Sequence, residues 1–170
     1  MDGVLADFET QLIIWYEKHY GVKVTRESFI GLPESEALPH KGVVRDFVTT
    51  SGFFRTLPVI EGAIDAVKKL MVHFEVYVVS AAMEFPLSLP EKYEWLQEHF
   101  PFITWRNIIF CGDKSIVNTD YMIDDHPKNL DHFKGKTIMF SAGHNANFSH
   151  HQRVNNWDEV LAFFETVAED

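Results

Sequence analysis

Residues 60–80 have the sequence IEGAIDAVKKLMVHFEVYVVS, and two hydrophobic periods follow each other within it. Its first half carries apolar side chains at helical spacing, namely Ile60, Ala63, Ile64, Val67 and Leu70. Residues 74–79 are instead rich in β-branched and aromatic side chains, which favour a strand, and polar Ser80 follows directly. This stretch therefore predicts a helix, then a strand, then a polar residue at the carboxyl end of that strand.

The chain downstream of Ser80 repeats this alternation. A second helix is expected around residues 89–100, and strand-like runs follow at 108–111, 121–123 and 137–140. A last helical stripe near the C-terminus consists of Val160, Leu161, Phe164 and Val167. Strands that alternate with helices predict an α/β fold with a parallel sheet, whose functional loops lie beyond the carboxyl ends of the strands.

Upstream of residue 60 the pattern changes twice. Apolar and aromatic residues recur at helical spacing at Phe8, Leu12, Trp15, Tyr16 and His19, and Gly21 is placed to end that helix. Residues 22–58 are irregular and contain several glycines and prolines, which predicts short helices and loops rather than a layer of a sheet. We interpret residues 22–58 as a small, mainly helical cap inserted into a core domain formed by residues 1–21 and 59–170.

The composition restricts the classes of function. A chain of 170 residues, 46% of them hydrophobic, can form one compact domain with a sizeable core. Its formal net charge of −10 argues against binding to polymeric nucleic acid, which depends on lysine and arginine. Its apolar runs are too short to span a membrane. The single cysteine, Cys111, agrees with a reducing compartment, so we expect a cytoplasmic protein.

Four polar clusters begin the chain or follow its apolar segments. They contain Asp2 in MDGVLADF (residues 1–8), Ser80, Lys114 in CGDK (residues 111–114), and the pair Asp124-Asp125 after YMI. Carboxylates can hold a hard divalent cation, whereas a hydroxyl and an ammonium group can bind the oxygens of a phosphate. Each residue alone has a simple structural explanation, such as a helix cap or a surface position. Their order and their shared position at strand ends favour a functional site.

In their order these clusters resemble the four motifs of the haloacid dehalogenase superfamily, and the resemblance covers essentially the whole chain. It implies a Rossmann-like three-layer sandwich with a cap inserted after the first motif. It also implies a phosphatase in which the first aspartate of an Asp-x-Asp motif attacks phosphorus and forms a phosphoaspartate. The second aspartate, which Asp2 matches, acts as general acid and base. The nucleophile is therefore expected immediately before Met1.

The same resemblance implies a Mg²⁺ site. The ion would be held by the nucleophile, by the backbone carbonyl of Asp2 and by Asp125, while Asp124 would orient its neighbour or a metal-bound water. The strand that leads into the nucleophile belongs at the centre of such a sheet, where strands on both sides depend on it. We therefore expect the natural protein to begin several residues before Met1, with an apolar strand that ends in aspartate.

Phosphate binding is implied for Ser80, Ala81 and Lys114. The acidic net charge does not oppose this, because one metal ion and one or two lysines can neutralise a single phosphate locally. We therefore expect a small phosphomonoester as the partner, with neither polymeric nucleic acid nor a membrane. The sequence leaves the oligomeric state, monomer or homodimer, open.

Several runs resemble the 5′(3′)-deoxyribonucleotidase branch of the superfamily in particular. They are residues 1–8, 52–54, 91–95, 113–114, 123–125 and 144–145. This resemblance implies a Mg²⁺-dependent hydrolase of nucleotide metabolism that dephosphorylates nucleoside monophosphates, above all those of deoxyribonucleosides. In that branch an aromatic patch between core and cap stacks on the nucleobase. Phe8, Phe53 and Phe54 are the candidates for it in this chain.

Two other functions fit part of the pattern. A non-catalytic nucleotide- or phosphate-binding protein of the same fold would need no nucleophile. A receiver-like phosphoacceptor domain has similar residues around Mg²⁺, but receivers place the acidic pair after the first strand, whereas here it follows Ser80 and Lys114. The histidine-rich residues 143–151 match no common spacing of zinc ligands, so we expect a surface loop there.

Overall fold

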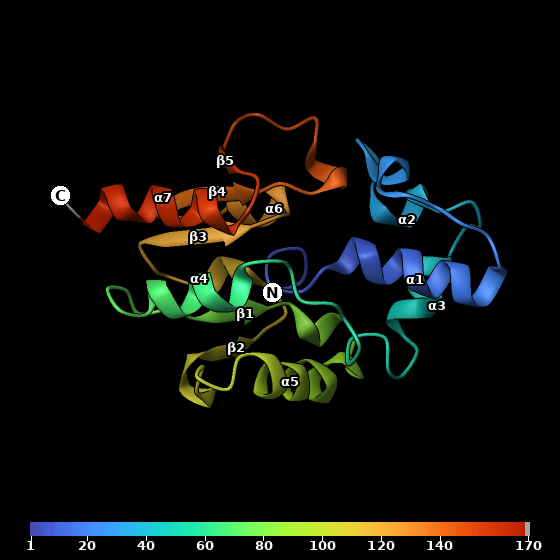
Figure 1. Ribbon diagram of the computed structural model, residues 1–170, viewed down its shortest axis with the longest axis horizontal. Coiled ribbons are helices and arrows are strands. Elements are labelled where there is room, and N and C mark those ends of the chain that lie inside the picture. Colours follow the sequence, from blue (N-terminus) through green and yellow to red (C-terminus); the bar gives the residue numbers. More distant parts are fainter. Residues whose placement is uncertain (169–170) are drawn as a thin grey trace.

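The computed structural model describes residues 1–168 and contains parallel strands flanked by helices (Figure 1). Strand β1 (Val78–Ser80) pairs with β2 (Ile108–Phe110). A second sheet contains β3 (Tyr121–Asp124), β4 (Lys136–Phe140) and β5 (Gln152–Val154) in that order. Every neighbouring pair is parallel. The predicted α/β fold is therefore confirmed, and it is consistent with the haloacid dehalogenase type.

Helices and short turns connect these strands. The helices of this part are α4 (Ala63–Leu70), α5 (Ser88–His99), α6 (Pro127–Leu130) and α7 (Trp157–Ala168). The 3-10 turns are η2 (Ala82–Glu84), η3 (Trp105–Asn107), η4 (Lys114–Ile116) and η5 (Gly143–Asn145). The sequence pattern predicts α4, α5, α7 and the first four strands, but it misses β5 and α6, which are three and four residues long. Among the described helices none combines the length and the apolar character needed to cross a membrane.

The N-terminal part begins with α1 (Phe8–Tyr20), which ends at Gly21 as predicted. The Asp7 side chain caps the start of α1 by accepting a hydrogen bond from the backbone N–H of Thr10 at 3.0 Å. Three short helices follow, namely η1 (Arg26–Phe29), α2 (Glu34–Ala37) and α3 (Val43–Val48). We call residues 26–48 the helical segment. Figure 1 shows α2 and α3 beside α1, at the end of the molecule away from α7. The cap boundaries at residues 22 and 58 stay a prediction.

Side chains of α5 hold the loop that returns from the helical segment to the core. The Glu91 carboxylate accepts hydrogen bonds at 2.5–3.1 Å from three backbone N–H groups of this loop, those of Gly52, Phe54 and Arg55. The buried indole of Trp95 donates a hydrogen bond to the carbonyl oxygen of Leu57 at 2.7 Å. These bonds fix the position of Phe54 relative to α5.

A groove separates the two sheets. Its cavity of about 170 Å³ is lined by residues of both facing strands and by the N-terminal residues, chiefly apolar ones: Met1, Val4, Leu5, Val67, Leu70, Val78, Met122 and Trp157. Figure 1 shows the N-terminus at this position, between β1 and β3. The amine of Met1 donates a hydrogen bond to the carbonyl oxygen of Val79 at 3.3 Å. The first residues of the chain therefore lie where β1 and β3 end.

Candidate active site

A cleft of about 410 Å³ opens at the carboxyl ends of β1 and β3. Most of the residues predicted to form the site line it, namely Asp2, Phe8, Phe54, Ser80, Ala81, Lys114 and Asp125. Asp124 and Phe53 are not among the lining residues, because both are buried in the protein. The lining also includes side chains that the sequence analysis left out of the site, among them Glu34, Phe85, Lys92 and His126. The helical segment and the core thus contribute to one cleft.

Asp2 is paired with one of these unforeseen residues, Lys92. The Oδ2 atom of Asp2 accepts a hydrogen bond from Lys92 Nζ at 2.6 Å, and the same ammonium group donates to Ser80 Oγ at 3.1 Å. Burial by itself would raise the pKa of Asp2, but the charge and hydrogen bond of Lys92, together with the charges of the Met1 amine and Lys114, outweigh it and hold this pKa below its usual range. The Oδ1 atom of Asp2 is buried without a hydrogen-bond partner in the described part of the chain. Asp2 is therefore ionised in the free protein and keeps one oxygen for a further ligand.

Lys92 reaches the cleft from α5 and is almost fully buried. Only 4% of its side chain is exposed, and its Nζ lies 4.2 Å from the centroid of the Phe54 ring, at the distance of a cation–π contact. Trp95 and Leu96 lie three and four residues later on the same helical face, and both are in the core. The signal in the sequence was thus a lysine on the apolar face of a predicted helix.

Lys114 and Asp124 form a second buried pair, with 2.6 Å between Nζ and Oδ2. The other carboxylate oxygen of Asp124 accepts hydrogen bonds from the backbone N–H of His126 at 2.9 Å and from Asn129 Nδ2 at 2.8 Å. Burial opposes both charges, but their attraction outweighs it, so the pKa of Asp124 is lowered and that of Lys114 is raised. Both oxygens of Asp124 are therefore engaged within the protein.

The carboxylate of Asp125 lacks such partners. Within residues 1–168 it accepts no hydrogen bond, and ring nitrogens of His144 and His126 lie 3.7 and 3.8 Å from its Oδ2. Burial raises the pKa of Asp125, and the neighbouring charge of Asp124 adds to this effect. Gly3 packs directly against this carboxylate, since a Cβ atom at Gly3 would lie 2.0 Å from Oδ2. Asp125 is therefore a buried carboxylate beside the Asp2-Gly3 backbone, and its oxygens can coordinate a cation.

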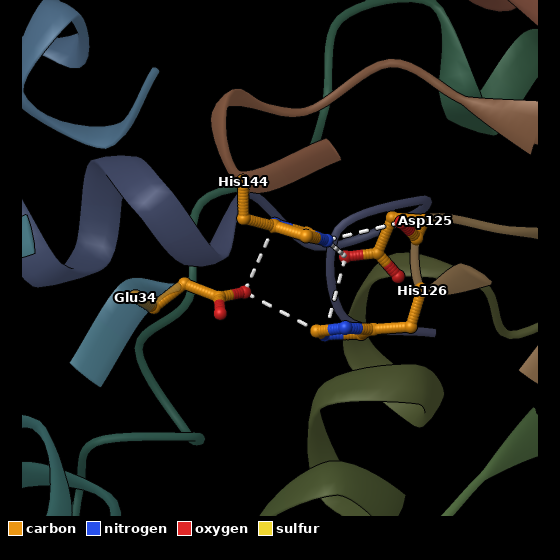
Figure 2. Close-up of side chains that lie close together, drawn as sticks. All are labelled: Glu34, Asp125, His126 and His144. Carbon is orange, nitrogen blue, oxygen red and sulfur yellow. Dashed lines mark hydrogen bonds and ion pairs between the residues drawn. The ribbon is translucent and has the colours of Figure 1, made fainter. Parts of the chain in front are cut away.

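Four side chains gather on the side of the cleft next to the helical segment (Figure 2). Glu34 Oε1 lies 3.1 Å from His144 Nδ1 and 3.5 Å from His126 Nε2. The two imidazole rings stack, with their centroids 4.3 Å apart and their planes at 21°. With Asp125 they form a set in which one ligand atom from each residue lies within 4.8 Å of the others. Such a set could bind a metal ion directly or act as an ion-pair network.

Comparison with known proteins shows which family this chain belongs to. The model of the family described as "5' nucleotidase, deoxy (Pyrimidine), cytosolic type C protein" matches residues 1–169. The chain belongs to this family. The family is one of nucleotidases, which are phosphoric monoester hydrolases, so the predicted resemblance to the deoxyribonucleotidase branch is confirmed.

Individual relatives agree with this family assignment. A Staphylococcus epidermidis protein, provisionally named a 5′(3′)-deoxyribonucleotidase, is 40% identical over 168 residues, which cover 98% of this chain and 94% of that protein. A Staphylococcus aureus protein with the same provisional name is 42% identical over 167 residues, covering 96% of this chain and 92% of its own. The 5′(3′)-deoxyribonucleotidase of Bacillus subtilis is 50% identical over 107 residues, covering 63% of this chain and 62% of its own.

The aromatic residues of the nucleotidase cleft divide into two groups. Phe8 and Phe54 line the cleft together with Phe85, and the rings of Phe54 and Phe85 are stacked with centroids 6.4 Å apart. Phe53 differs from the prediction, because it is fully buried and packs edge-on against Trp15 at 5.1 Å. Of these two neighbours in the turn at residues 51–56, only Phe54 lines the cleft.

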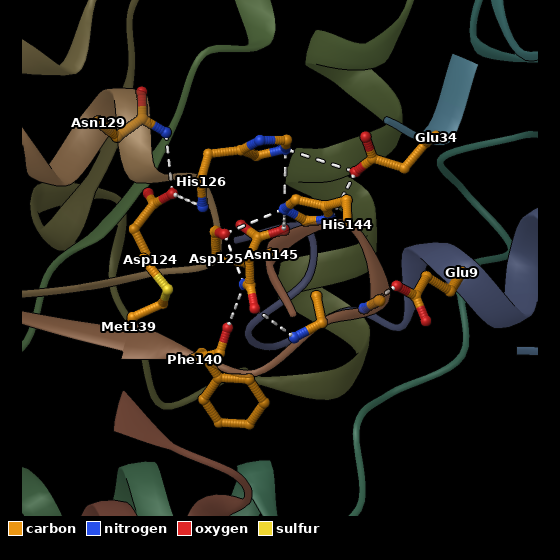
Figure 3. Close-up of polar contacts among 12 residues, drawn as sticks. Glu9, Glu34, Asp124, Asp125, His126, Asn129, Met139, Phe140, His144 and Asn145 are labelled. Carbon is orange, nitrogen blue, oxygen red and sulfur yellow. Dashed lines mark hydrogen bonds and ion pairs between the residues drawn. The ribbon is translucent and has the colours of Figure 1, made fainter. Parts of the chain in front are cut away.

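The stretch around His144 also differs from the prediction of a surface loop. His144 and Asn145 lie in η5, and both side chains are directed at the backbone of Asp125 (Figure 3). Its carbonyl oxygen accepts hydrogen bonds from Asn145 Nδ2 at 2.7 Å and from His144 Nε2 at 3.0 Å. Asn145 is completely buried and donates a second hydrogen bond to the carbonyl oxygen of Phe140 at 2.8 Å. The end of β4 is thereby tied to the acidic pair that follows β3.

The donor atoms of the site fit the metal dependence of the nucleotidase family. The Asp125 carboxylate is buried with a raised pKa, and the backbone at Asp2 and Gly3 lies beside it. Carboxylate and backbone carbonyl oxygens are donors that hard divalent cations prefer. A bound cation would offset the cost of burying the charge of Asp125. The residues present therefore fit such an ion.

Proposed function

We propose that this protein is a Mg²⁺-dependent phosphatase that hydrolyses nucleoside monophosphates, with those of deoxyribonucleosides as its main substrates. The observation that carries the proposal is the joint position of Asp2, Ser80, Lys114 and Asp125 around one cleft at the ends of two parallel strands. The names of the relatives support a nucleotide substrate. The aromatic wall of the cleft, formed by Phe8, Phe54 and Phe85, supports it independently, because aromatic rings can stack on a nucleobase.

Phosphate binding is assigned to the Ser80 hydroxyl, the backbone N–H of Ala81 and the Lys114 ammonium group. Lys114 stays charged, because its pairing with Asp124 raises its pKa despite burial. Lys92 adds a second ammonium group within hydrogen-bond distance of Ser80. These two charges give the cleft a local positive potential for a phosphate dianion, although the whole chain carries a net charge of −10.

Mg²⁺ binding is assigned to the Asp125 carboxylate and the backbone carbonyl of Asp2. When bound, the ion would supply charge compensation for the phosphoryl group during its transfer. Asp124 is not assigned as a direct ligand, because Lys114, Asn129 and the His126 backbone already use both of its oxygens. It holds Lys114 in place and ties the end of β3 to α6 through Asn129.

Asp2 is assigned as the general acid and base. It would give a proton to the nucleoside oxygen as the P–O bond breaks and the phosphoryl group passes to the nucleophilic aspartate. It would then take a proton from the water that attacks the phosphoaspartate and releases inorganic phosphate. Because Lys92 and the other nearby positive charges lower the pKa of Asp2, the first of these steps requires prior uptake of a proton, whereas the second starts from the ionised carboxylate.

The nucleophilic aspartate is expected just before Met1, and this part stays a prediction. The apolar groove between β1 and β3 supports it, because an apolar strand there could pair with both sheets. Such a strand would deliver its last residue beside Met1, whose backbone nitrogen lies 3.3 Å from the carbonyl oxygen of Val79.

The test is phosphate release by the full-length protein from deoxyribo- and ribonucleoside 5′- and 3′-monophosphates, with and without Mg²⁺. We expect Mg²⁺-dependent release from the wild type and a fall of about 10²–10⁴-fold in Asp2→Asn, as is typical for loss of a general acid or base. Near-normal turnover in Asp2→Asn would contradict the role of Asp2. Nucleotide binding without any phosphate release would support a non-catalytic nucleotide-binding protein instead.

A further inference from the structure

An unbroken series of contacts runs from the helical segment to the carboxylate assigned to the metal. It begins at Glu34, the first residue of α2, whose Oε1 lies 3.1 Å from His144 Nδ1. The opposite ring nitrogen of His144, Nε2, lies 3.0 Å from the carbonyl oxygen of Asp125 and 3.7 Å from its Oδ2 (Figure 2). A single imidazole ring therefore touches both a carboxylate of the helical segment and the residue assigned to the metal.

The contact between Glu34 and His144 differs from an ordinary surface ion pair because its groups are largely buried. Side-chain exposure is 6% for His144, 7% for Asp125 and 16% for Glu34. The contact between Glu34 and His144 is therefore held in a site with little solvent, where removing one polar partner leaves the other without a replacement from water.

The contacts around His144 restrict how its ring can move when Glu34 moves. Its ring stacks on that of His126, the residue after Asp125, which also lies 3.5 Å from Glu34 Oε1. Asn145 bonds to the same carbonyl oxygen of Asp125 and is completely buried. His144 Nδ1, although close to Glu34, is buried without a well-aligned hydrogen bond in the described chain. A shift of Glu34 therefore changes the environment of both imidazole rings, of which His144 is the nearer, and through them that of Asp125.

We propose that Glu34 and His144 are positioning residues that couple the placement of the helical segment to the metal affinity of Asp125. The inference rests on the proposed function, since it takes Asp125 as a metal ligand. With Glu34 in place, His144 Nδ1 has a carboxylate oxygen 3.1 Å away, and the ring keeps its position beside Asp125, whose carboxylate stays available to a cation. Without Glu34, the ring loses this contact and can move closer to Asp125 Oδ2, which is 3.7 Å from Nε2, where it competes with the cation. By reciprocity, metal binding at Asp125 strengthens the attachment of α2 to the core.

The test uses Mn²⁺ as the probe on the full-length protein, with its dissociation constant and stoichiometry measured by calorimetry and by electron paramagnetic resonance. The variants are Glu34→Gln, His144→Gln and the double variant. Glu36→Gln is the matched control, because it removes an exposed carboxylate from the same helix. We expect Glu34→Gln to weaken Mn²⁺ binding by about 10-fold, within the range for residues that orient a metal ligand, and Glu36→Gln to leave it unchanged.

The double variant decides between indirect and direct action. If Glu34 acts through His144, adding Glu34→Gln to His144→Gln produces no further loss of Mn²⁺ affinity. A full 10-fold further loss would overturn the inference, because Glu34 would then act without His144, either through His126 or on the cation directly. Two Mn²⁺ ions per wild-type chain, one of them lost in Glu34→Gln, would also overturn it in favour of direct ligation. If the wild type binds no Mn²⁺, or binds it equally well after replacement of Asp125, the proposed function itself would be contradicted.

Amide hydrogen exchange provides a second readout that needs only the Glu34 variant. In the wild type, Mn²⁺ should slow exchange in residues 34–48 of the helical segment, because the ion and α2 stabilise the same arrangement of His144. In Glu34→Gln this slowing should disappear while the far-ultraviolet circular dichroism spectrum stays that of the wild type. Equal slowing in both proteins would overturn the coupling even if the His144 variants do not fold.

Discussion

Lys92 Nζ and Asp2 Oδ2 lie 2.6 Å apart and join α5 to the beginning of the chain across a separation of 90 residues. The same ammonium group contacts Ser80 and the face of the Phe54 ring. Helix α5 thus supplies the counter-charge of the proposed acid and base, a position beside the phosphate site and a contact to the aromatic wall. Among the positive charges that lower the pKa of Asp2, that of Lys92 has the largest effect.

Replacing Lys92 by methionine should raise the pKa of Asp2, because burial then acts on its carboxylate against the weaker opposing charges of the Met1 amine and Lys114 alone. The free energy of unfolding should fall by about 1–3 kcal/mol at neutral pH, since a partly buried carboxylate loses its hydrogen-bonding partner. Carbon-13 NMR of the aspartate carboxyl groups, with Asp2→Asn to assign the signal, measures the pKa. The double variant Asp2→Asn/Lys92→Met should recover part of the stability. An unchanged pKa in Lys92→Met would contradict the role of this pair.

Gly3→Ala should displace Asp125, because the new Cβ atom would lie 2.0 Å from its Oδ2. A second cost comes from the backbone, since φ at Gly3 is 70°, a region that L residues rarely adopt. Gly21→Ala is the matched control, because φ is 66° there and no atom lies within 4 Å of the added Cβ. We expect a loss of about 1 kcal/mol in Gly21→Ala with normal Mn²⁺ binding. Gly3→Ala should lose more stability and bind Mn²⁺ more weakly, and equal effects at both sites would contradict the close packing on Asp125.

Stability should depend on pH through His144. Its pKa is about 9 in the folded protein, against about 6.5 for an ordinary histidine, so its stabilising effect is complete below pH 6.5 and is lost as pH rises through 9. In metal-free protein, the difference in unfolding free energy between wild type and His144→Gln should therefore be larger at pH 6 than at pH 9.5, by on the order of 3 kcal/mol. Urea titrations at both pH values measure it. A difference that does not change with pH would show that His144 is uncharged in the folded state.

The core of the fold was predictable from local pattern, because its longer elements have clear periods. The helices α4, α5 and α7 carry apolar stripes, and β1 to β4 are short apolar runs followed by polar or turn residues. Strand β5 escaped prediction since QRV lacks an apolar run, and its place beside β4 depends on tertiary contacts. The pairing order of the strands likewise follows from the packing of the whole domain rather than from any one segment.

The site was predictable where it follows strand ends and was missed where it depends on tertiary approach. Asp2, Ser80, Lys114 and Asp125 could be found because the carboxyl ends of parallel strands meet at one edge. His144 looked like part of a polar surface loop, yet η5 turns its side chain under Asp125. Residues such as His144 carry no local signal in the sequence, because their burial depends on how distant segments pack together.

The last prediction concerns the aromatic wall, where the structure separates two neighbours that the sequence treats alike. Phe54 lines the cleft and Phe53 is fully buried, so Phe54→Leu and Phe53→Leu form a matched pair that removes one ring each and keeps apolar volume. If Phe54 stacks on the nucleobase, its loss should reduce turnover of a nucleotide by about 5- to 100-fold relative to a small aryl phosphate, which corresponds to roughly 1–3 kcal/mol of stacking. The comparison of two substrates matters because Phe54 also touches Lys92, and a disturbed Lys92 would slow both reactions equally. Phe53→Leu should lower the melting temperature and leave the ratio of the two rates unchanged. An unchanged ratio in Phe54→Leu would mean that this ring only packs against Lys92, and support for a nucleotide substrate would then come from the relatives alone.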